Sequence, residues 1–420
     1  MFLKSIEKHN KIMMGIFLLY SISLFISKPG ISLFGGILAI ISIFTFNEIR
    51  VNYIQNKDNL NKNILYLFFS LFIISVVFQM FSINGFRSAV KCFYKTYYLL
   101  ILPLTIYLIN EYRCSNKIFT TMELALFAGI LKSFQVFYSV YHLKYYTGMR
   151  VISFFGIGRW GVVVVLGMLF ILPNLDSKLS KKNIFSWVVF STGIISLILN
   201  GSRGPLLSFV LGVVFYIIFG RRIKLGITLL ALVVILGGSI SIKNPKILNK
   251  VINRVESVKE TKSVSNGARI YMWKESLVFM KEGLYKNKKL FFFGTGFYDS
   301  KTKTRTKLFK EHLDSRESYE SLDKGIKGAV SFMDAHNSYL NRLLETGIVY
   351  TVFYYLSVFL TVICILKNYI KTQSTRILSI LSVIVAFAFC GIFYGYAATY
   401  ETFLFFFMIS LGLTNQENLD

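Results

Sequence analysis

The stretch GIVYTVFYYLSVFLTVICIL, residues 347–366, contains twenty consecutive residues and no charged side chain. A helix rises 1.5 Å per residue, so a helix of this length is about as long as the hydrocarbon layer of a membrane is thick. The stretch therefore predicts a transmembrane helix.

Similar apolar runs recur along the whole chain of 420 residues, of which 54% are hydrophobic. They lie at about 12–27, 31–47, 64–82, 96–110, 121–141, 157–174, 183–200, 204–220, 224–241, 377–395 and 398–413. The first run follows three lysines but lacks a small-residue cleavage site, which favours a retained helix over a removed signal peptide. The pattern predicts an all-α polytopic membrane protein with about twelve transmembrane helices.

The distribution of Lys and Arg between the short loops predicts the orientation. If the N-terminus is cytoplasmic, the inner segments hold seventeen positive charges and the short outer loops hold about seven. Positive charge is enriched on the cytoplasmic side of membrane proteins. We therefore expect both termini in the cytoplasm.

One long segment interrupts the alternation of helices and short loops. The predicted organisation is a membrane domain over 1–241, a loop over 242–346 outside the cytoplasm, and a second membrane domain over 347–420. The loop holds 21 Lys and Arg against 12 Asp and Glu. Long loops with structure of their own are usually functional.

Two parts of this loop carry a recognisable pattern. In NGARIYMWKESLVFMKEG, residues 266–283, apolar residues recur at helical spacing, with Gly283 as the expected stop. The expected apolar positions are Ile270, Tyr271, Trp273, Leu277 and Val278. The polar stretch 301–328 is expected to be solvated.

The stretch DAHNSYLNRLLETG, residues 334–347, carries one of only four histidines in the chain. Its apolar residues fall on one helical face, which places His336 in a first turn, with Asp334 or Ser331 as the cap. A helix N-terminus disfavours imidazolium, whereas a nearby carboxylate favours it, so the balance is open. His336 is either a packing or capping residue or a group that accepts a proton.

GSRGPLLSF, residues 201–209, places Arg203 at the outer end of an apolar run. Pro205 is tolerated in a first helical turn, and the flanking glycines permit close backbone approach. Arg203 beside free helix-start N–H groups suits an anion site. The alternative is an interfacial arginine that extends to lipid headgroups.

Other basic residues are expected on the same outer side. Arg269 lies on the loop helix, and Arg159 in GIGRWG lies near the outer end of another run. Further members of this outer set are Arg87, Lys91, Lys95, Lys144 and Arg150. Together they indicate an anionic partner such as phosphate, pyrophosphate or acidic lipid, and membrane lipids are the expected surroundings; no nucleic-acid partner is expected.

Several chemistries lack their sequence signals. The four cysteines show no CxxC or zinc spacing, which argues against a metal site or a disulfide framework. The apolar runs contain almost no carboxylates, which weakens a proton- or sodium-coupled transporter. No GxxxxGK[ST] nucleotide loop is present. No metal and no cofactor are expected.

Two motifs together resemble the O-antigen ligase and O-antigen polymerase superfamily. An R-x3-L pattern, Arg203 to Leu207, opens one apolar run, and an H-x10-G pattern, His336 to Gly347, follows the long loop. Between them, NGARIYMWKESL is similar to the arginine-bearing segment of the ligase's periplasmic loop. The resemblance implies a GT-C-like fold of twelve membrane helices, with the loop between helices nine and ten.

The resemblance also implies an activity and a location. It implies a metal-independent, inverting glycosyl transfer at the periplasmic face of a Gram-negative inner membrane. The donor is a glycan on undecaprenyl pyrophosphate, and the ligase acceptor is a sugar hydroxyl of lipid A-core. His336 is then the general base, and the substrate-binding residues are Arg203, Arg269, Arg159 and Asn337.

Three features favour a ligase: both spacings are met in full, the GAR segment is in the expected place, and the loop is basic. A basic loop suits lipid A-core because this acceptor is itself phosphorylated. The pattern AHNSYLNRLLETG is also typical of O-antigen polymerases, which join lipid-linked repeat units. A flippase or exporter and a non-catalytic envelope scaffold are two further alternatives. The sequence leaves open whether His142 or His312 assists, and we expect structural roles for Arg342 and Glu345.

Overall fold

The computed structural model describes residues 2–55, 59–142, 151–176, 181–243, 264–297, 303–395 and 399–414. Within these ranges every regular element is a helix, and there is no strand. The predicted all-α class is therefore confirmed.

Each predicted apolar run lies mainly on one helix of the described chain. These helices are α1 (Phe2–Ile26), α2 (Lys28–Phe44), α4 (Asn59–Met80), α6 (Tyr98–Tyr112), α7 (Ser115–His142), α8 (Ile157–Phe170), α10 (Lys181–Asn200), α11 (Arg203–Phe219), α12 (Ile223–Lys243), α19 (Ser338–Thr372), α20 (Thr375–Gly391) and α21 (Tyr400–Gly412). Shorter helices lie between them: α3 (Phe46–Gln55), α5 (Phe86–Thr96) and α9 (Leu172–Asp176).

By length and composition, five helical segments of the described residues are long and apolar enough to cross a membrane. They are 63–80, 86–112, 157–176, 183–200 and 338–372, and six shorter apolar helices accompany them. The total of about twelve crossings stays a prediction.

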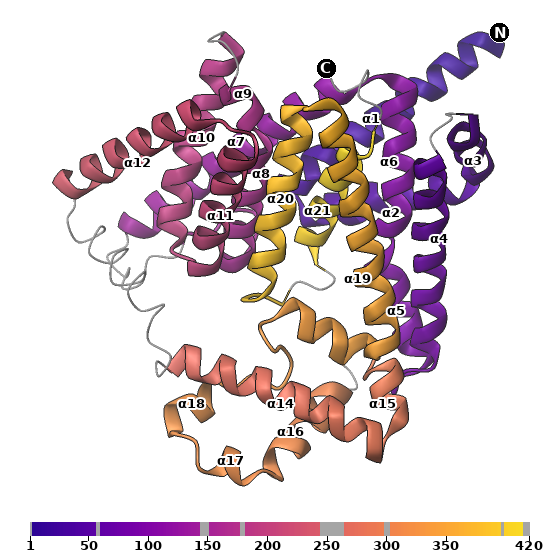
Figure 1. Ribbon diagram of the computed structural model, residues 1–420, viewed down its shortest axis with the longest axis vertical. Coiled ribbons are helices and arrows are strands. Elements are labelled where there is room, and N and C mark those ends of the chain that lie inside the picture. The colour runs from indigo at the N-terminus through magenta and orange to yellow at the C-terminus, as the bar shows by residue number, and fades with distance from the viewer. Residues whose placement is uncertain are drawn as a thin grey trace.

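The helices form one bundle, with α8 and α21 in its interior (Figure 1). Residues 160–170 of α8 and 401–412 of α21 are buried on every face, as expected of a helix that is apolar all round. Helices at the periphery expose large apolar side chains instead. Examples are Ile227, Leu230 and Val234 on α12 and Val352, Leu356 and Phe359 on α19. Such surfaces suit contact with hydrocarbon.

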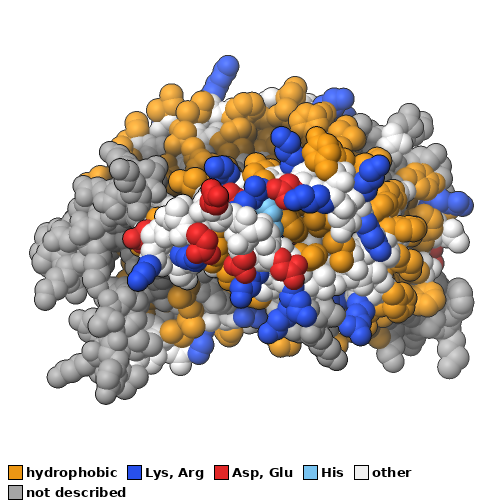
Figure 2. Space-filling view, turned by 90° about the horizontal axis from the view of Figure 1, so that it is seen from below, with side chains coloured by type: hydrophobic (Ala, Val, Ile, Leu, Met, Phe, Trp, Pro, Cys, Tyr) orange, Lys and Arg blue, Asp and Glu red, His pale blue; other side chains and the backbone are white. Residues whose placement is uncertain are grey.

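Five helices of the long loop form a layer at one end of the bundle, opposite the start of α1 (Figure 1). They are α14 (Val264–Lys286), α15 (Lys288–Phe293), α16 (Thr304–Asp314), α17 (Glu317–Glu320) and α18 (Lys324–Ala329). The layer has a small hydrophobic core that includes Met272, Phe279 and Phe309, and Leu344 of α19 also contributes to it. Seen from this end, the surface carries side chains of both charges, with apolar side chains around them (Figure 2).

The predicted face of α14 is partly wrong. Ile270 and Leu277 are exposed, whereas Met272, Glu275 and Phe279 are buried. The apolar pattern did not reveal this face because it includes a carboxylate, Glu275, that pairs with a side chain of α16.

The predicted helix stop at Gly283 is also wrong, because α14 continues to Lys286. A Cβ on Gly283 would lie 3.1 Å from Leu290, so the glycine permits close packing of α15. Asn287 then separates the two helices and accepts a hydrogen bond from the Leu290 N–H.

The expectation of a solvated stretch over 301–328 is partly wrong for the described residues 303–328, because many of them are exposed but several are buried. These residues form α16, α17 and the start of α18. Arg305, Phe309, His312 and Leu313 of α16 are buried. Arg305 and His312 are buried because they pair with Glu345 of α19 and Glu275 of α14, which are distant in sequence.

Helix α19 is broken at Gly347, whose φ of 71° and ψ of 178° are open essentially only to glycine. Gly294, with φ 77°, lies against this break, and a Cβ on either glycine would collide with the backbone of the other segment. The N–H groups of Thr295 and Gly296 donate to the carbonyls of Leu344 (2.8 Å) and Glu345 (3.0 Å). The loop backbone therefore satisfies carbonyls that the break removes from the helix.

We expect Gly347→Ala to lower the free energy of unfolding by about 1–3 kcal/mol from backbone strain, with a further loss from the collision at Phe292. The thermal unfolding midpoint in detergent measures the effect. Gly36→Ala in α2 is the matched control, since nothing lies within 4 Å of its added carbon. Equal midpoints for the two variants would contradict this account of the break.

Candidate functional site

His336 lies in the segment that leads from the loop into α19, two residues before the first helical residue, Ser338. Its backbone is left-handed, with φ 49°. Its N–H donates to Asp334 Oδ1 at 2.7 Å, and its Nδ1 lies 3.6 Å from Asp334 Oδ2. The imidazole side chain is 41% exposed, so it is accessible to a substrate.

The predicted cap of this helix is wrong. Asn337 is the N-cap, and its Oδ1 accepts hydrogen bonds from the N–H groups of Tyr339 and Leu340, both at 3.0 Å. Neither predicted residue binds a first-turn N–H group of the helix through these contacts. Asp334 Oδ1 accepts from the His336 N–H, and Ser331 Oγ accepts from the Asp334 N–H at 3.1 Å. His336 therefore precedes the first turn instead of lying in it.

The three predicted arginines lie near the starts of three different helices. Arg203 is the first residue of α11, Arg159 is in the first turn of α8, and Arg269 follows the first turn of α14. Arg159 Nε lies 3.5 Å from Oε1 of the buried Glu401. The first-turn N–H groups of α8 and α11 add positive potential near the guanidinium groups.

One cavity of about 410 Å³ brings these residues together with His336. Its described lining consists of Gly156, Ile157, Gly158, Arg159, Ser202, Arg203, Gly204, Ser265, Asn266, Arg269, Asp334, His336, Tyr394 and Gly395. Three guanidinium groups against one carboxylate make the lining strongly positive, which suits an anion with several oxygens. Asn337 does not line this cavity.

Sequence reasoning did not find Tyr394, which belongs to the same lining. Cβ atoms on Gly158 and Gly204 would lie 2.6 and 2.7 Å from the Tyr394 ring, so both glycines make room for it. A glycine beside each arginine was the available signal that a large side chain packs between the two helix starts. Tyr394 thereby closes one side of the cavity.

An apolar groove of about 180 Å³ continues from the cavity between α11 and α14. It shares Arg203, Gly204, Asn266 and Arg269 with the cavity. Its remaining lining is Leu207, Ile270, Trp273 and Phe393. A ligand with an anionic group in the cavity can therefore place an apolar part beside the same arginines.

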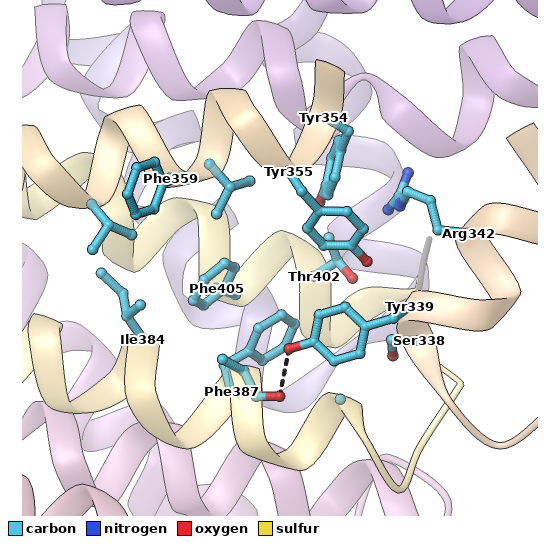
Figure 3. A pocket seen from close by; sticks show the side chains of 14 residues that line it. Ser338, Tyr339, Arg342, Tyr354, Tyr355, Phe359, Ile384, Phe387, Thr402 and Phe405 are labelled. Carbon is cyan, nitrogen blue, oxygen red and sulfur yellow. Dashed lines mark hydrogen bonds between the residues drawn. The ribbon is translucent and has the colours of Figure 1, made fainter. Parts of the chain in front are cut away.

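A second apolar pocket, of about 240 Å³, lies between α19, α20 and α21 (Figure 3). At one end, Tyr339 Oη donates to the Ala388 carbonyl at 2.7 Å, which joins α19 to α20. Ser338 Oγ donates to the Tyr394 carbonyl at 2.5 Å. These two hydrogen bonds fix the start of α19 just after His336.

Arg342 and Glu345 contact other protein side chains. Arg342 is buried, with its guanidinium carbon 3.8 Å from the ring centre of Tyr354. Glu345 Oε1 lies 3.5 Å from Arg305 Nη1. These contacts agree with structural roles for both residues.

His312 lies in the loop layer and does not line the cavity. Its Nε2 is 3.2 Å from Glu275 Oε2, and its ring packs on Phe279 and Phe309. Burial, and then the charge of Arg316, lower the pKa of His312 below its usual range. The side chain of His142 lies outside the described residues.

The described helices and this cavity define a helical membrane protein with a histidine–arginine site at one end of its bundle. Residues 188–355 match the model of the O-antigen ligase family, a family of glycosyltransferase-like enzymes. The matched segment contains Arg203, Arg269 and His336. The resemblance to the O-antigen ligase superfamily is therefore confirmed over this segment. No curated protein matches the chain significantly.

We expect the loop layer to lose stability as the pH falls. The pKa of His312 is lower in the folded protein, so the unfolded chain binds the proton more tightly. The stabilisation is therefore complete when the pH is above the pKa of His312 in the unfolded chain, about 6.5. It decreases as the pH falls toward the lower pKa of His312 in the folded protein. Hydrogen exchange in α14 and α16, corrected for intrinsic rates, should be faster at pH 5.5 than at pH 7.5.

His312→Gln removes the titrating group and should reduce this difference between the two pH values. An unchanged pH dependence in the variant would assign the effect to other groups.

Proposed function

We propose that this protein is an O-antigen ligase, which transfers a glycan from undecaprenyl pyrophosphate to a sugar hydroxyl of lipid A-core. The observation that carries the proposal is that His336 lines one cavity with Arg159, Arg203 and Arg269. A general base and a set of cations are what an inverting transfer from a pyrophosphate donor requires of a protein.

In the proposed reaction the acceptor hydroxyl oxygen attacks C1 of the donor sugar. The new C1–O bond forms as the bond from C1 to the pyrophosphate oxygen breaks, and the configuration at C1 inverts. His336 accepts the hydroxyl proton, which makes a weak nucleophile more reactive. Nδ1 faces Asp334, so Nε2 is the nitrogen available to the hydroxyl.

Arg203 and Arg269 bind the pyrophosphate and stabilise the negative charge that it gains on leaving. Arg159 lines the same cavity and adds positive charge to it, and it also pairs with the buried Glu401. The first-turn N–H groups of α11 add further stabilisation. No step in this scheme uses a metal ion or a cofactor.

The groove between α11 and α14 is proposed to take the start of the polyprenyl chain. The chain is attached directly to the pyrophosphate, so its first units must lie next to the arginines. Leu207, Ile270, Trp273 and Phe393 provide apolar surface there. We further propose that the protein lies in the inner membrane of a Gram-negative bacterium, with this cavity on the periplasmic side and both termini cytoplasmic.

Complementation in two hosts tests the reaction. One host lacks its ligase and the other its polymerase, and acceptor and repeat unit match those of the source. We expect long-chain lipopolysaccharide to return in the ligase-deficient host on a gel, and to be lost with His336→Ala at equal expression.

Rescue only in the polymerase-deficient host, where single repeats become a ladder, would instead make the protein an O-antigen polymerase. Undiminished rescue by His336→Ala would contradict the role of the histidine and favour a flippase or a scaffold.

The arginines are tested by Arg203→Gln and Arg269→Gln in purified protein with a labelled lipid-linked donor. We expect each variant to lower kcat/KM by about 100-fold, the loss typical of removing one donor to a developing negative charge. Arg87→Gln is the matched control, because Arg87 is an exposed arginine of α5 that does not line the cavity. Equal losses for all three variants would assign the effect to overall charge.

A further inference from the structure

A buried arginine of the loop layer is connected to His336 through two intervening side chains. Arg305 of α16 is 4% exposed. Its Nη2 donates to Asn341 Oδ1 at 2.5 Å, and its Nη1 lies 3.5 Å from Glu345 Oε1. Burying a guanidinium is costly unless it is paired and hydrogen-bonded, so these contacts hold α16 firmly on α19.

Asn341 joins this arginine to Asp334. Asn341 Oδ1 accepts from Arg305 and from the Ala335 N–H (3.0 Å), whereas its Nδ2 donates to Asp334 Oδ1 at 2.5 Å. The opposite orientation of the amide would place Nδ2 against two donors and Oδ1 against a carboxylate. The surroundings therefore fix the orientation of Asn341.

Asp334 in turn contacts His336 at two points. Its Oδ1 accepts from the His336 N–H, and its Oδ2 faces the imidazole Nδ1. The peptide between them is held as well, because Trp273 Nε1 of α14 donates to the Ala335 carbonyl at 2.9 Å. Helices α14, α16 and α19 thus all fix the short segment 334–336.

We propose that Arg305 and Asn341 are positioning residues that hold the Asp334 carboxylate against His336, so that docking of α16 on α19 orients the base. The inference rests on the proposed role of His336 and extends it to the loop layer. Asp334 stabilises the imidazolium that forms when His336 accepts the proton, and it keeps Nε2 directed at the acceptor.

A purely structural network would also bury Arg305 and Asn341. The two accounts differ in whether the Asp334 charge acts on the reaction. Asp334 lines the cavity and bears the one carboxylate among its described lining. The other charged groups that face the cavity are Arg159, Arg203 and Arg269, which all disfavour imidazolium. Removal of the Asp334 charge should therefore change the pH dependence of the reaction as well as its rate.

Asp334→Asn is the decisive variant, because an amide oxygen retains the acceptor for His336 N–H and Asn341 while the charge is lost. In purified protein with a lipid-linked donor and its acceptor, we expect kcat to fall by about 10- to 100-fold. The acid limb of the pH–rate profile should move to lower pH, with KM for the donor nearly unchanged.

Arg305→Gln tests the more distant end of the connection and should lower kcat in the same direction as Asp334→Asn. Arg305→Lys should recover part of the loss, since it retains a buried cation beside Asn341. Lys307→Gln is the control, an exposed cation of the same helix that should leave the profile unchanged. The thermal unfolding midpoint of each variant separates loss of folding from loss of orientation.

A fall in kcat for Asp334→Asn without movement of the acid limb would overturn the proposal, and so would an unchanged kcat. These results differ from failure of the proposed function, in which His336→Ala itself would retain activity. If Arg305→Gln fails to fold, the profile of Asp334→Asn still decides the question.

Discussion

The contact between the loop backbone and the break in α19 is the constraint on which the site depends. A helix that enters a membrane loses stability wherever its carbonyls lack partners, because no water is available to replace them. Here the N–H groups of Thr295 and Gly296 bind the carbonyls of Leu344 and Glu345. The contact requires glycine at 294 and 347, and it fixes the direction in which residues 338–346 leave the membrane-embedded part of α19. The position of His336 follows from that direction.

The candidate site is assembled from the starts of helices that are far apart in sequence. Helices α8 and α11 both pack against α20, and the turn after α20 carries Tyr394 between their first residues. Glycines at 158 and 204 make this approach possible. The arginines beside them then face the same volume as His336, and the helix dipoles act in the same direction as the guanidinium charges. An anionic group bound there would meet positive charge without any movement of the bundle.

The apolar runs predicted the helices of the bundle well, whereas the buried faces and helix ends of the loop layer were predicted poorly. In hydrocarbon, burial of apolar side chains and internal hydrogen bonding dominate, so composition and length suffice to place a helix. In the loop layer, stability also depends on buried polar contacts. Glu275 lies on the buried face of α14 because it meets His312, and Arg305 is buried because it meets Asn341 and Glu345. No periodicity within one segment reveals such partners.

The sequence by itself determined the helical class and the existence of a basic loop, and it predicted the residues of the candidate site: His336 and the arginines at 159, 203 and 269. Their motifs are local, and charged residues at the ends of apolar runs are conspicuous. Only the tertiary structure decided that these four residues line one cavity, that Asn337 caps α19 without reaching that cavity, and that Asp334 contacts the imidazole. These facts depend on how distant helices pack and on one left-handed residue, His336, which takes the chain out of the helical pattern that its sequence predicts.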